Sequence, residues 1–302
     1  MKDSLILQFA IFALIGAGFL VRKLGVVSQQ GQKSLTNLVV DVILPCNIVK
    51  AFLTADLEKI RADGLWVLGI SLVFHLLCIA YGHLLFRRPP ADQRNCLRFA
   101  SLCSNAGFMG NPVAEGLYGL EGLALANIYL IPMRTLMWST GIAIFSGSHD
   151  WKNTLKKVLT HPCIIAVELG VLGMLLRIEL PELLMKPLTY FSSCNTAMSM
   201  LVIGMILARI EPKQFLDRTV LLFSIHRLIL LPALLYAICL LLPVSTMARN
   251  VCVILAAMPV AANTSILADQ YDANPVYATK LVVVSTLFSI PTTLLWSMFL
   301  MG

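Results

Sequence analysis

The stretch Ser104-Asn105-Ala106-Gly107-Phe108-Met109-Gly110-Asn111-Pro112 lies in the middle of a long apolar segment, where a membrane-spanning helix would be expected to continue. Two glycines, two asparagines and a proline instead favour an interruption of that helix. At bilayer depth, freed backbone N–H and C=O groups are tolerated only where protein or a polar cavity satisfies them. The stretch therefore predicts a site inside the membrane, and a transport site in particular.

The chain as a whole has the composition of an integral membrane protein. Of its 302 residues, 58% are hydrophobic and 13% are charged, and the mean hydropathy is +0.82. With ~20 residues per span, we draw ten apolar segments, at 4–21, 34–53, 64–86, 95–118, 123–146, 158–176, 187–208, 219–242, 248–269 and 276–300. The connections are short, so we expect no soluble domain. These features predict an all-α, multi-pass protein of the plasma or inner membrane with ten transmembrane helices.

The first segment is interpreted as a retained span and not as a signal peptide. Arg22 and Lys23 follow the apolar run, whereas a signal peptide carries its positive charge in front of it. Membrane lipid is therefore an expected partner along the whole chain.

The net charge of +7 does not indicate a nucleic-acid partner, because the basic residues are spread over many loops and form no single patch. Loops after odd-numbered spans carry about twice as many Lys and Arg residues as the other side, with Arg227 counted in the loop between spans 7 and 8. By the positive-inside tendency, we expect both termini on the outer side. The eight cysteines include no CxxC pair and are interpreted as small buried hydrophobes, not as a disulfide framework or a metal site.

Matching motifs indicate an internal repeat of five spans. Lys33-Ser34-Leu35-Thr36 opens span 2 and Lys186-Pro187-Leu188-Thr189 opens span 7, while Ile131-Pro132 of span 5 corresponds to Ile290-Pro291 of span 10. We therefore divide the chain into residues 1–150 and 151–302. Because five is an odd number, the second half must be inverted across the bilayer, as in many secondary transporters.

The repeat also predicts a second broken helix, in span 9. The segment Ala257-Met258-Pro259-Val260-Ala261-Ala262-Asn263-Thr264-Ser265 supplies it. Two interrupted helices in corresponding positions point to a binding site near the bilayer midplane.

These motifs resemble those of the auxin efflux carrier family of membrane transporters. The matching residues are Leu44-Pro45, then Asn105 and Gly107 through Pro112, then Met258-Pro259 through Asn263, and Ala268-x-Gln270-Tyr271. The resemblance covers essentially the whole chain. It implies a scaffold of spans 1, 2, 6 and 7 that also forms a homodimer contact, and a mobile transport domain of spans 3–5 and 8–10. It further implies that spans 4 and 9 cross near their prolines, that substrate binds beside the crossing, and that transport follows an elevator-like alternating access.

The residues at the two breaks favour an anionic substrate. Asn111 is a favoured N-cap and Pro112 is favoured at the next position, so we expect a half-helix to begin there. After Pro259, Asn263-Thr264-Ser265 can cap a second restart in the same way. Each helix N-terminus carries about half a positive charge, so the pair suits a carboxylate. The alternative is that Pro112 and Pro259 merely kink two ordinary helices.

Arg134 is the best candidate for a fixed positive charge that faces the anion. It lies within span 5, where a cation costs a few kcal/mol or more unless it is paired. The alternative is a structural ion pair with Glu115 of span 4 or Glu168 of span 6. Its counterpart in the second half is approximately Thr293, so only one half carries this charge.

Further polar residues inside the predicted spans are weaker candidates. Asp41 and Asn47 in span 2 and Asn195 in span 7 either complete the site or make interhelical hydrogen bonds of about 1 kcal/mol. Asp41 is favoured for function, since a lone carboxylate in a span can carry a coupling proton. The predicted substrate site thus consists of Asn105, Gly107, Asn111, Pro112, Arg134, Pro259, Asn263 and Thr264, with Asp41, Asn47 and Asn195 as accessory residues.

Other classes of protein fit the sequence less well. An intramembrane enzyme would need paired catalytic groups, yet HExxH and GxSxG are missing from the sequence. A primary pump would need a nucleotide site such as GxxxxGK[ST], which is also missing. A sensor would need a signalling domain. The main alternative is a sodium-coupled symporter of the bile-acid-transporter type, which would want acidic or hydroxyl ligands at the crossing. We expect no cofactor, leave proton or sodium coupling open, and leave open which small organic acid is the substrate.

Overall fold

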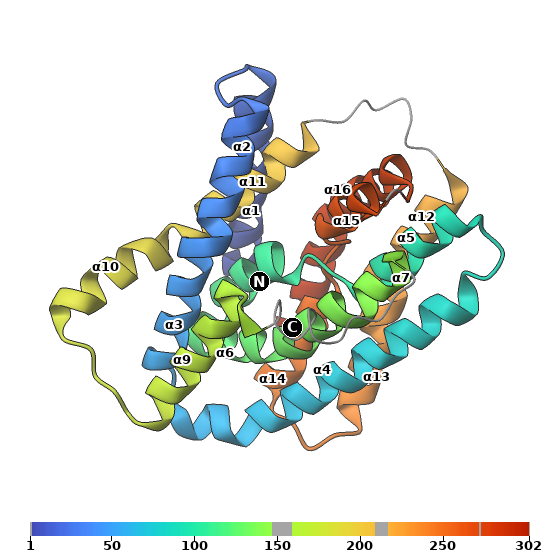
Figure 1. Ribbon diagram of the computed structural model, residues 1–302. Coiled ribbons are helices and arrows are strands. Elements are labelled where there is room, and N and C mark those ends of the chain that lie inside the picture. The colour runs from blue at the N-terminus through green and yellow to red at the C-terminus, as the bar shows by residue number, and fades with distance from the viewer. Residues whose placement is uncertain (1, 147–158, 209–216, 272, 302) are drawn as a thin grey trace.

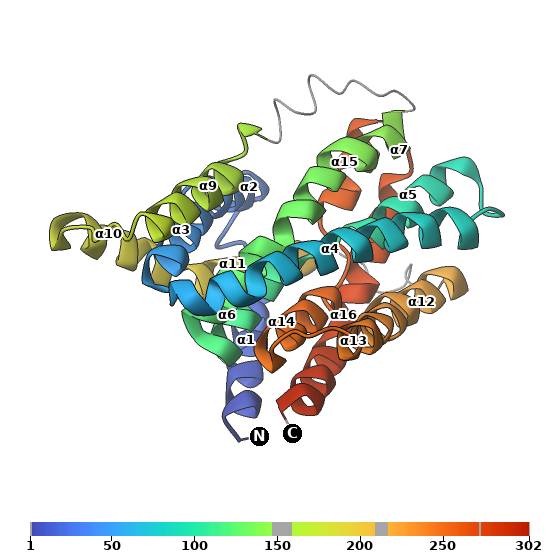
Figure 2. The same ribbon diagram turned by 90° about the horizontal axis from the view of Figure 1, so that it is seen from below.

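The computed structural model describes residues 2–146, 159–208, 217–271 and 273–301, and its regular elements there are helices (Figures 1 and 2). Six helical stretches are long and apolar enough to cross a membrane, and Pro162–Leu175 and Thr246–Ala256 are shorter apolar helices. The all-α membrane class is therefore confirmed. The count of ten spans stays a prediction.

In the first half of the chain, helices occupy all five apolar segments. The longest apolar stretch runs from Ala106 to Phe145, and a continuous helix of that length would be about 60 Å long, twice the bilayer core. Gly119 divides it, with φ 65° and ψ −160°, a conformation open essentially to glycine alone. The elements are α1 (Lys2–Lys23), α2 (Gln29–Leu38), η1 (Val39–Ile43), α3 (Leu44–Thr54), α4 (Leu57–Leu85), α5 (Ala91–Leu102), η2 (Ala106–Gly110), α6 (Asn111–Leu136), η3 (Met137–Gly141) and α7 (Ile142–Ser146).

The second half of the chain follows the same order in outline. In the ninth apolar segment of the chain, the helix is interrupted near the middle, between α14 and α15. The elements are α9 (Pro162–Leu175), α10 (Glu182–Ser193), α11 (Asn195–Leu207), α12 (Arg218–Ile225), η5 (His226–Leu230), α13 (Leu231–Leu240), α14 (Thr246–Ala256), α15 (Asn263–Gln270) and α16 (Pro275–Met301).

Three of the described π-turns end two residues before a proline. They are η1 before Pro45, η2 before Pro112 and η5 before Pro232. A proline has no N–H for the carbonyl four residues earlier, and its ring clashes with that carbonyl, so a wider turn relieves the contact. At η5 the freed carbonyl of Leu228 accepts a hydrogen bond of 2.9 Å from the indole Nε1 of Trp296.

The helices gather into two lobes. One contains α1, α2, α3, α9, α10 and α11, and the other contains α4, α5, α7, α12, α13, α15 and α16, with α6 and α14 between them (Figure 2). Within the first lobe, α1 packs on α11 and α9 packs on α3. Gly18 and Gly204 permit the first of these contacts, because a Cβ atom on either would overlap a backbone carbonyl oxygen of the opposite helix.

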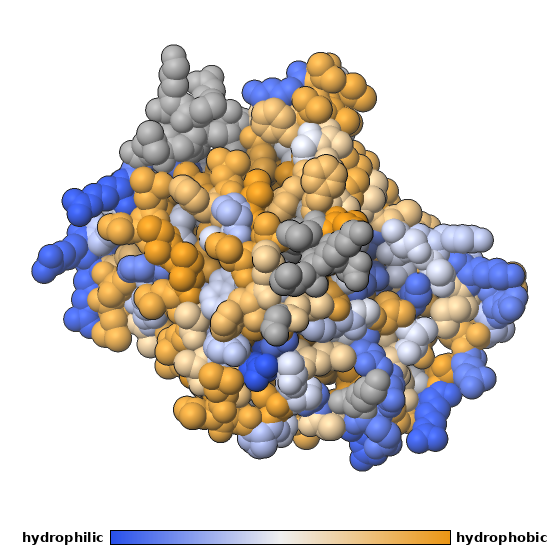
Figure 3. Space-filling model, turned by 180° about the vertical axis from the view of Figure 1, so that it is seen from behind, coloured by the Kyte–Doolittle hydropathy of each residue, from blue (hydrophilic) through white to orange (hydrophobic). Residues whose placement is uncertain are grey.

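The outer surface is strongly apolar. Large side chains are exposed along many helices, among them Phe9 at 77%, Leu65 at 78% and Leu183 at 83%. On the face shown in Figure 3, hydrophobic residues predominate and hydrophilic residues gather toward the edges. A surface of this kind suits contact with lipid rather than water.

Candidate substrate site at the two helix breaks

The two predicted helix interruptions meet inside the protein. Residues 103–105 separate α5 from η2, and residues 257–262 separate α14 from α15. The Asn105 N–H donates to the Pro259 carbonyl oxygen at 2.7 Å, and the Ala261 N–H donates to the Cys103 carbonyl oxygen at 3.2 Å. This antiparallel bridge between Ser104 and Val260 satisfies backbone groups that would otherwise be costly at membrane depth. The chain is thus interrupted at both places, and the alternative of two simple proline kinks is wrong.

Side chains hold the two breaks in place. The Val260 N–H donates to Ser285 Oγ of α16 at 3.0 Å, and Ser104 Oγ donates to the Leu255 carbonyl oxygen at 3.4 Å. Gly110 lies so close to the second break that a Cβ atom there would overlap the Leu255 side chain. Both breaks are therefore packed inside the protein rather than exposed to lipid.

The first half-helix starts earlier than the sequence predicts. It begins at Ala106, and Asn105 (φ −78°, ψ 37°) stands at the boundary. Asn111 has helical dihedrals (φ −57°, ψ −50°), and its backbone N–H donates to the Ala106 carbonyl oxygen. Its predicted role as an N-cap is wrong, because a cap residue needs a non-helical backbone. Pro112 instead widens the preceding turn, which continues the helix past Asn111.

The Asn111 side chain turns toward α6 beyond Gly119. Its Nδ2 donates to Asn127 Oδ1 at 3.2 Å, and Asn127 Nδ2 donates to the Leu123 carbonyl oxygen at 2.9 Å. Asn111 is fully buried and its Oδ1 has no hydrogen-bond partner within the described residues. Asn111 therefore links the two arms of α6 and keeps one acceptor unused.

The second half-helix starts at Asn263, and here too the predicted side-chain cap is wrong. Ala262 stands at the boundary with helical dihedrals (φ −58°, ψ −27°) and caps nothing with its side chain. Asn263 Nδ2 contacts the Met137 sulfur at 3.6 Å instead. Thr264 is fully buried, and its Oγ1 has no hydrogen-bond partner in the described part of the chain.

Arg134 lies against the start of the first half-helix. A Cβ atom placed on Gly107 would lie 3.8 Å from Arg134 Nη2. The arginine is 6% exposed, and its Nη1 has no hydrogen-bond partner within the ranges that the structure describes. The alternative, an ion pair of Arg134 with Glu115 or Glu168, does not form within the described residues. An ion pair that does form there joins Lys186 and Glu182 at 3.0 Å.

This end of the helix therefore concentrates positive charge. The N–H groups of Ala106, Gly107 and Phe108 are the first of the half-helix and have no acceptor within it. Together with the Arg134 guanidinium, they form a cluster of hydrogen-bond donors that suits an anion. In the second half of the chain, Thr293 is fully buried and uncharged.

Asn47 of α3 and Asn195 of α11 are both buried and contact each other. Asn195 Nδ2 donates to Asn47 Oδ1 at 3.3 Å, and Asn47 Nδ2 donates to Ser192 Oγ at 3.0 Å and to Glu115 Oε2 at 3.3 Å. Ser199 Oγ completes the network by donating to Asn195 Oδ1 at 3.3 Å. Of the three accessory candidates, these two are brought together, whereas Asp41 is exposed in η1.

Two further residues escaped the sequence analysis. Arg227, counted above as a loop residue, is 1% exposed inside the helix that runs from Arg218 to Leu240, and its Nε and Nη1 have no hydrogen-bond partner in the described residues. The apolar run on both sides of it was the available signal. Glu115 was considered only as a partner of Arg134, and its contact with Asn47, 68 positions away, leaves no local signal.

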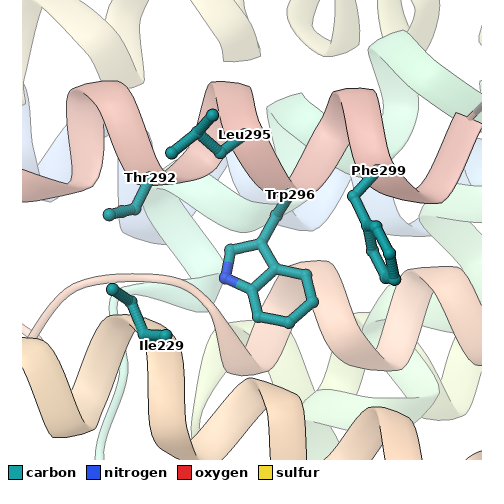
Figure 4. A pocket seen from close by; sticks show the side chains of 5 residues that line it. All are labelled: Ile229, Thr292, Leu295, Trp296 and Phe299. Carbon is teal, nitrogen blue, oxygen red and sulfur yellow. The ribbon is translucent and has the colours of Figure 1, made fainter.

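A separate apolar groove lies on the second lobe. It has a volume of about 260 Å³ and is lined by Ile229, Thr292, Leu295, Trp296 and Phe299 (Figure 4). None of these side chains is charged, and Trp296 already uses its N–H on Leu228. The groove therefore does not suit an organic anion.

The apolar surface and the helical architecture define a multi-pass membrane protein, and comparison with known proteins defines its class. The model of the family described as "Membrane transport protein" (Mem_trans) matches residues 5–154 and 148–297. The chain therefore belongs to this transporter family, that of the auxin efflux carriers, and is not an enzyme. The division of the match into two halves agrees with the internal repeat.

Two archaeal proteins are similar over almost their entire lengths. An uncharacterized transporter of Methanocaldococcus jannaschii is 26% identical over 97% of both chains. An uncharacterized transporter of Methanothermobacter thermautotrophicus is 27% identical over 96% of both chains. The similarity extends over both halves and both helix breaks.

Proposed function

We propose that this chain is a secondary transporter that moves a small organic carboxylate anion across the membrane and binds it at the two helix breaks. The observation that carries the proposal is the Arg134 guanidinium, buried, without a counter-ion in the described residues and adjacent to Gly107 at a half-helix N-terminus. A buried cation is costly unless an anion pairs with it. A carboxylate substrate supplies that partner.

The proposed site is made by both halves of the chain. Asn105, Gly107, Asn111, Pro112 and Arg134 contribute the electropositive side. Pro259, Asn263 and Thr264 form the opposite side, where the Thr264 hydroxyl, which has no partner among the described residues, offers a neutral contact. The two segments are joined by the hydrogen bond from the Asn105 N–H to the Pro259 carbonyl oxygen. A ligand bound at one break therefore lies close to the other break as well.

We further propose ten spans in two inverted halves, with the first lobe as the scaffold. The second lobe together with α6 and α14, which include both breaks, would be the moving part of an elevator. The direct backbone approach of α1 and α11 at Gly18 and Gly204 supports a rigid scaffold. The hydrogen bonds of Asn105, Val260 and Ser285 support a transport domain that moves as one body.

The same proposal places the protein in the plasma or inner membrane with both termini outside. Removing the buried Arg227 from the loop count leaves the excess of basic residues on the predicted inner side. A homodimer through scaffold helices is supported by exposed apolar side chains on α9 and α10, where Leu169 is 58%, Leu183 83% and Tyr190 71% exposed. Native mass spectrometry of the detergent-solubilised protein tests the dimer.

A ligand screen tests the proposed function. The purified protein is heated with a panel of mono- and dicarboxylic acids, each paired with its uncharged amide. A ligand that binds only the folded protein raises the midpoint temperature of thermal unfolding by mass action. We expect at least one acid to stabilise the protein and its amide to have no effect. Equal stabilisation by acid and amide, or by neither, would contradict the proposal.

The same screen with sodium or potassium chloride separates the proposed transporter from the sodium-coupled alternative. Stabilisation by the acid in potassium chloride favours a site whose charge comes from the protein. Stabilisation that requires sodium favours the symporter, because the ion then completes the site.

A further inference from the structure

Glu115 is the titratable member of a hydrogen-bonded network of otherwise neutral groups. It lies on the first arm of α6, which continues the half-helix that begins after the first break, whereas Asn47, Ser192 and Asn195 lie on α3, α10 and α11 of the first lobe. Its Oε2 accepts a hydrogen bond of 3.3 Å from Asn47 Nδ2. The contact thus joins the segment that we propose to move to the segment that we propose to stay.

The surroundings offer this carboxylate little compensation. Glu115 is only partly exposed, and the neighbouring Gly116 packs against the Leu7 side chain of α1. The helices packed on α6 carry further titratable groups, among them Lys50 on α3, Cys163 and Glu168 on α9, His75 on α4, and Arg249 and Cys252 on α14. Of these, Lys50 acts electrostatically on Glu115.

Movement of α6 along the first lobe would remove the interactions that stabilise the negative charge of Glu115. Glu115 would lose the hydrogen bond from the Asn47 amide and the attraction of Lys50, and moving an unpaired carboxylate through an apolar interface is energetically costly. A protonated carboxyl group does not carry this cost. The neutral form can therefore pass where the charged form is held.

We propose that Glu115 binds the proton that is coupled to transport, in a network with Asn47, Ser192 and Asn195. In the resting arrangement the Asn47 amide holds the carboxylate, and protonation at Glu115 releases it so that α6 can move. The inference rests on the proposed transport function. It replaces the candidate that the sequence favoured, Asp41, which is exposed.

Reconstituted protein tests the coupling, with Glu115→Gln as the variant and Glu168→Gln as the matched control, since Glu168 is an exposed carboxylate within an apolar segment. In liposomes, an imposed proton gradient drives uptake of the acid found in the screen. We expect Glu115→Gln to retain exchange of labelled for unlabelled substrate while its net uptake no longer responds to the gradient. The control should behave as the wild type. Gradient-driven uptake by Glu115→Gln at the wild-type level would overturn the proposal.

A second measurement needs no substrate, so it separates failure of this inference from failure of the proposed function. Infrared difference spectra are recorded between mildly alkaline and mildly acidic solution. We expect a protonated-carboxyl band that is present in the wild type and in Glu168→Gln and missing in Glu115→Gln. A band that persists unchanged in Glu115→Gln would show that this carboxyl group does not take up the proton.

Discussion

The two helix breaks share a backbone design but differ in length, in charge and in the helix to which each leads. The first, at residues 103–105, is short and leads into a helical arm of 13 residues that ends before Gly119. The second, at residues 257–262, is longer and leads into the 8-residue α15. Arg134 lies beside the first, whereas its counterpart Thr293 is neutral.

This comparison separates the structural task of the breaks from their chemical task. Both halves contribute equally to the bridge between Ser104 and Val260, because the backbone groups of both must be satisfied inside the membrane. Positive charge is needed only once for a single anion. A repeat can therefore keep its symmetry in the backbone while it loses it in the side chains.

The largest expected effect comes from removing the charge of the first break. We expect Arg134→Gln to lower affinity for the carboxylate by about tenfold to a hundredfold, since hydrogen bonds to charged groups contribute about 1.5–3 kcal/mol. Calorimetric titration measures the affinity. Thr293→Val is the matched variant at the second half and should bind within about threefold of the wild type, a change under 1 kcal/mol. Equal losses in both variants would remove the asymmetry.

The packing between the two breaks is tested next. Gly110→Ala places a methyl group against the buried Leu255 and Met258 side chains, and overpacking of this kind costs about 1–3 kcal/mol. We expect thermal unfolding several degrees lower. Gly16→Ala is the control, because no atom outside its own helix lies within 4 Å of the added carbon. An unchanged midpoint for Gly110→Ala would mean that the two breaks are loosely packed against each other.

The asparagines at the two breaks should differ more modestly. Asn111→Ala removes a buried amide with an unused acceptor and should weaken binding by about tenfold, equivalent to ~1.4 kcal/mol. Asn263→Ala removes an amide that contacts only the Met137 sulfur among described partners and should have a smaller effect. Competition with a labelled acid compares them. A larger loss of affinity for Asn263→Ala than for Asn111→Ala would indicate that the substrate binds nearer to the second break.

The smallest effect concerns a surface link between the segments that flank the two breaks. Asn274 Nδ2 donates to Asp92 Oδ2 at 2.8 Å, and this bond holds the pKa of Asp92 below its usual value. A depressed pKa stabilises the fold above the ordinary pKa of about 3.9 and loses that contribution as the pH falls through the folded value.

Asn274→Ala should therefore lower the melting temperature slightly near neutral pH, and less so in acid, where Asp92 is protonated. The pH-dependent part is small because the carboxylate is largely solvated, whereas loss of the hydrogen bond from the Tyr277 N–H to Asn274 Oδ1 lowers the melting temperature equally at every pH. Melting curves over a range of pH measure it, and Asp92→Asn should remove the pH-dependent part of the difference. A difference that grows in acid would contradict the assignment.

The positions of the breaks could be predicted from composition, but their detailed geometry could not. Glycine, asparagine and proline together marked residues 104–112 and 257–265 as interrupted. The restart at Ala106 escaped prediction because Asn111-Pro112 favours a cap locally, whereas the π-turn η2 lets the helix pass through. Residue types therefore predict that a helix boundary lies near Pro112. Whether the helix ends there depends on whether a π-turn can accommodate the proline.

Contacts between distant segments set the other limit. The charge of Arg134 was predicted from its place in an apolar run, but its proximity to Gly107 depends on how α6 folds back at Gly119. The contact of Asn47 with Glu115 joins residues from different helices, and no spacing rule connects them. Arg227 was missed because it was assigned to the end of a loop rather than to the apolar run around it.

The packing of the first lobe has a consequence for how the two halves depend on each other. The first helix of each half has its main partner in the other half, since α1 packs on α11 and α9 packs on α3. Neither half can therefore complete its helix packing alone. Produced separately, each half would expose the helix surface around Gly18 or Gly204 that the other half covers. Produced together as two polypeptides, residues 1–150 and 151–302 should therefore reassemble, because α1 and α9 each find their packing partner only in the other polypeptide.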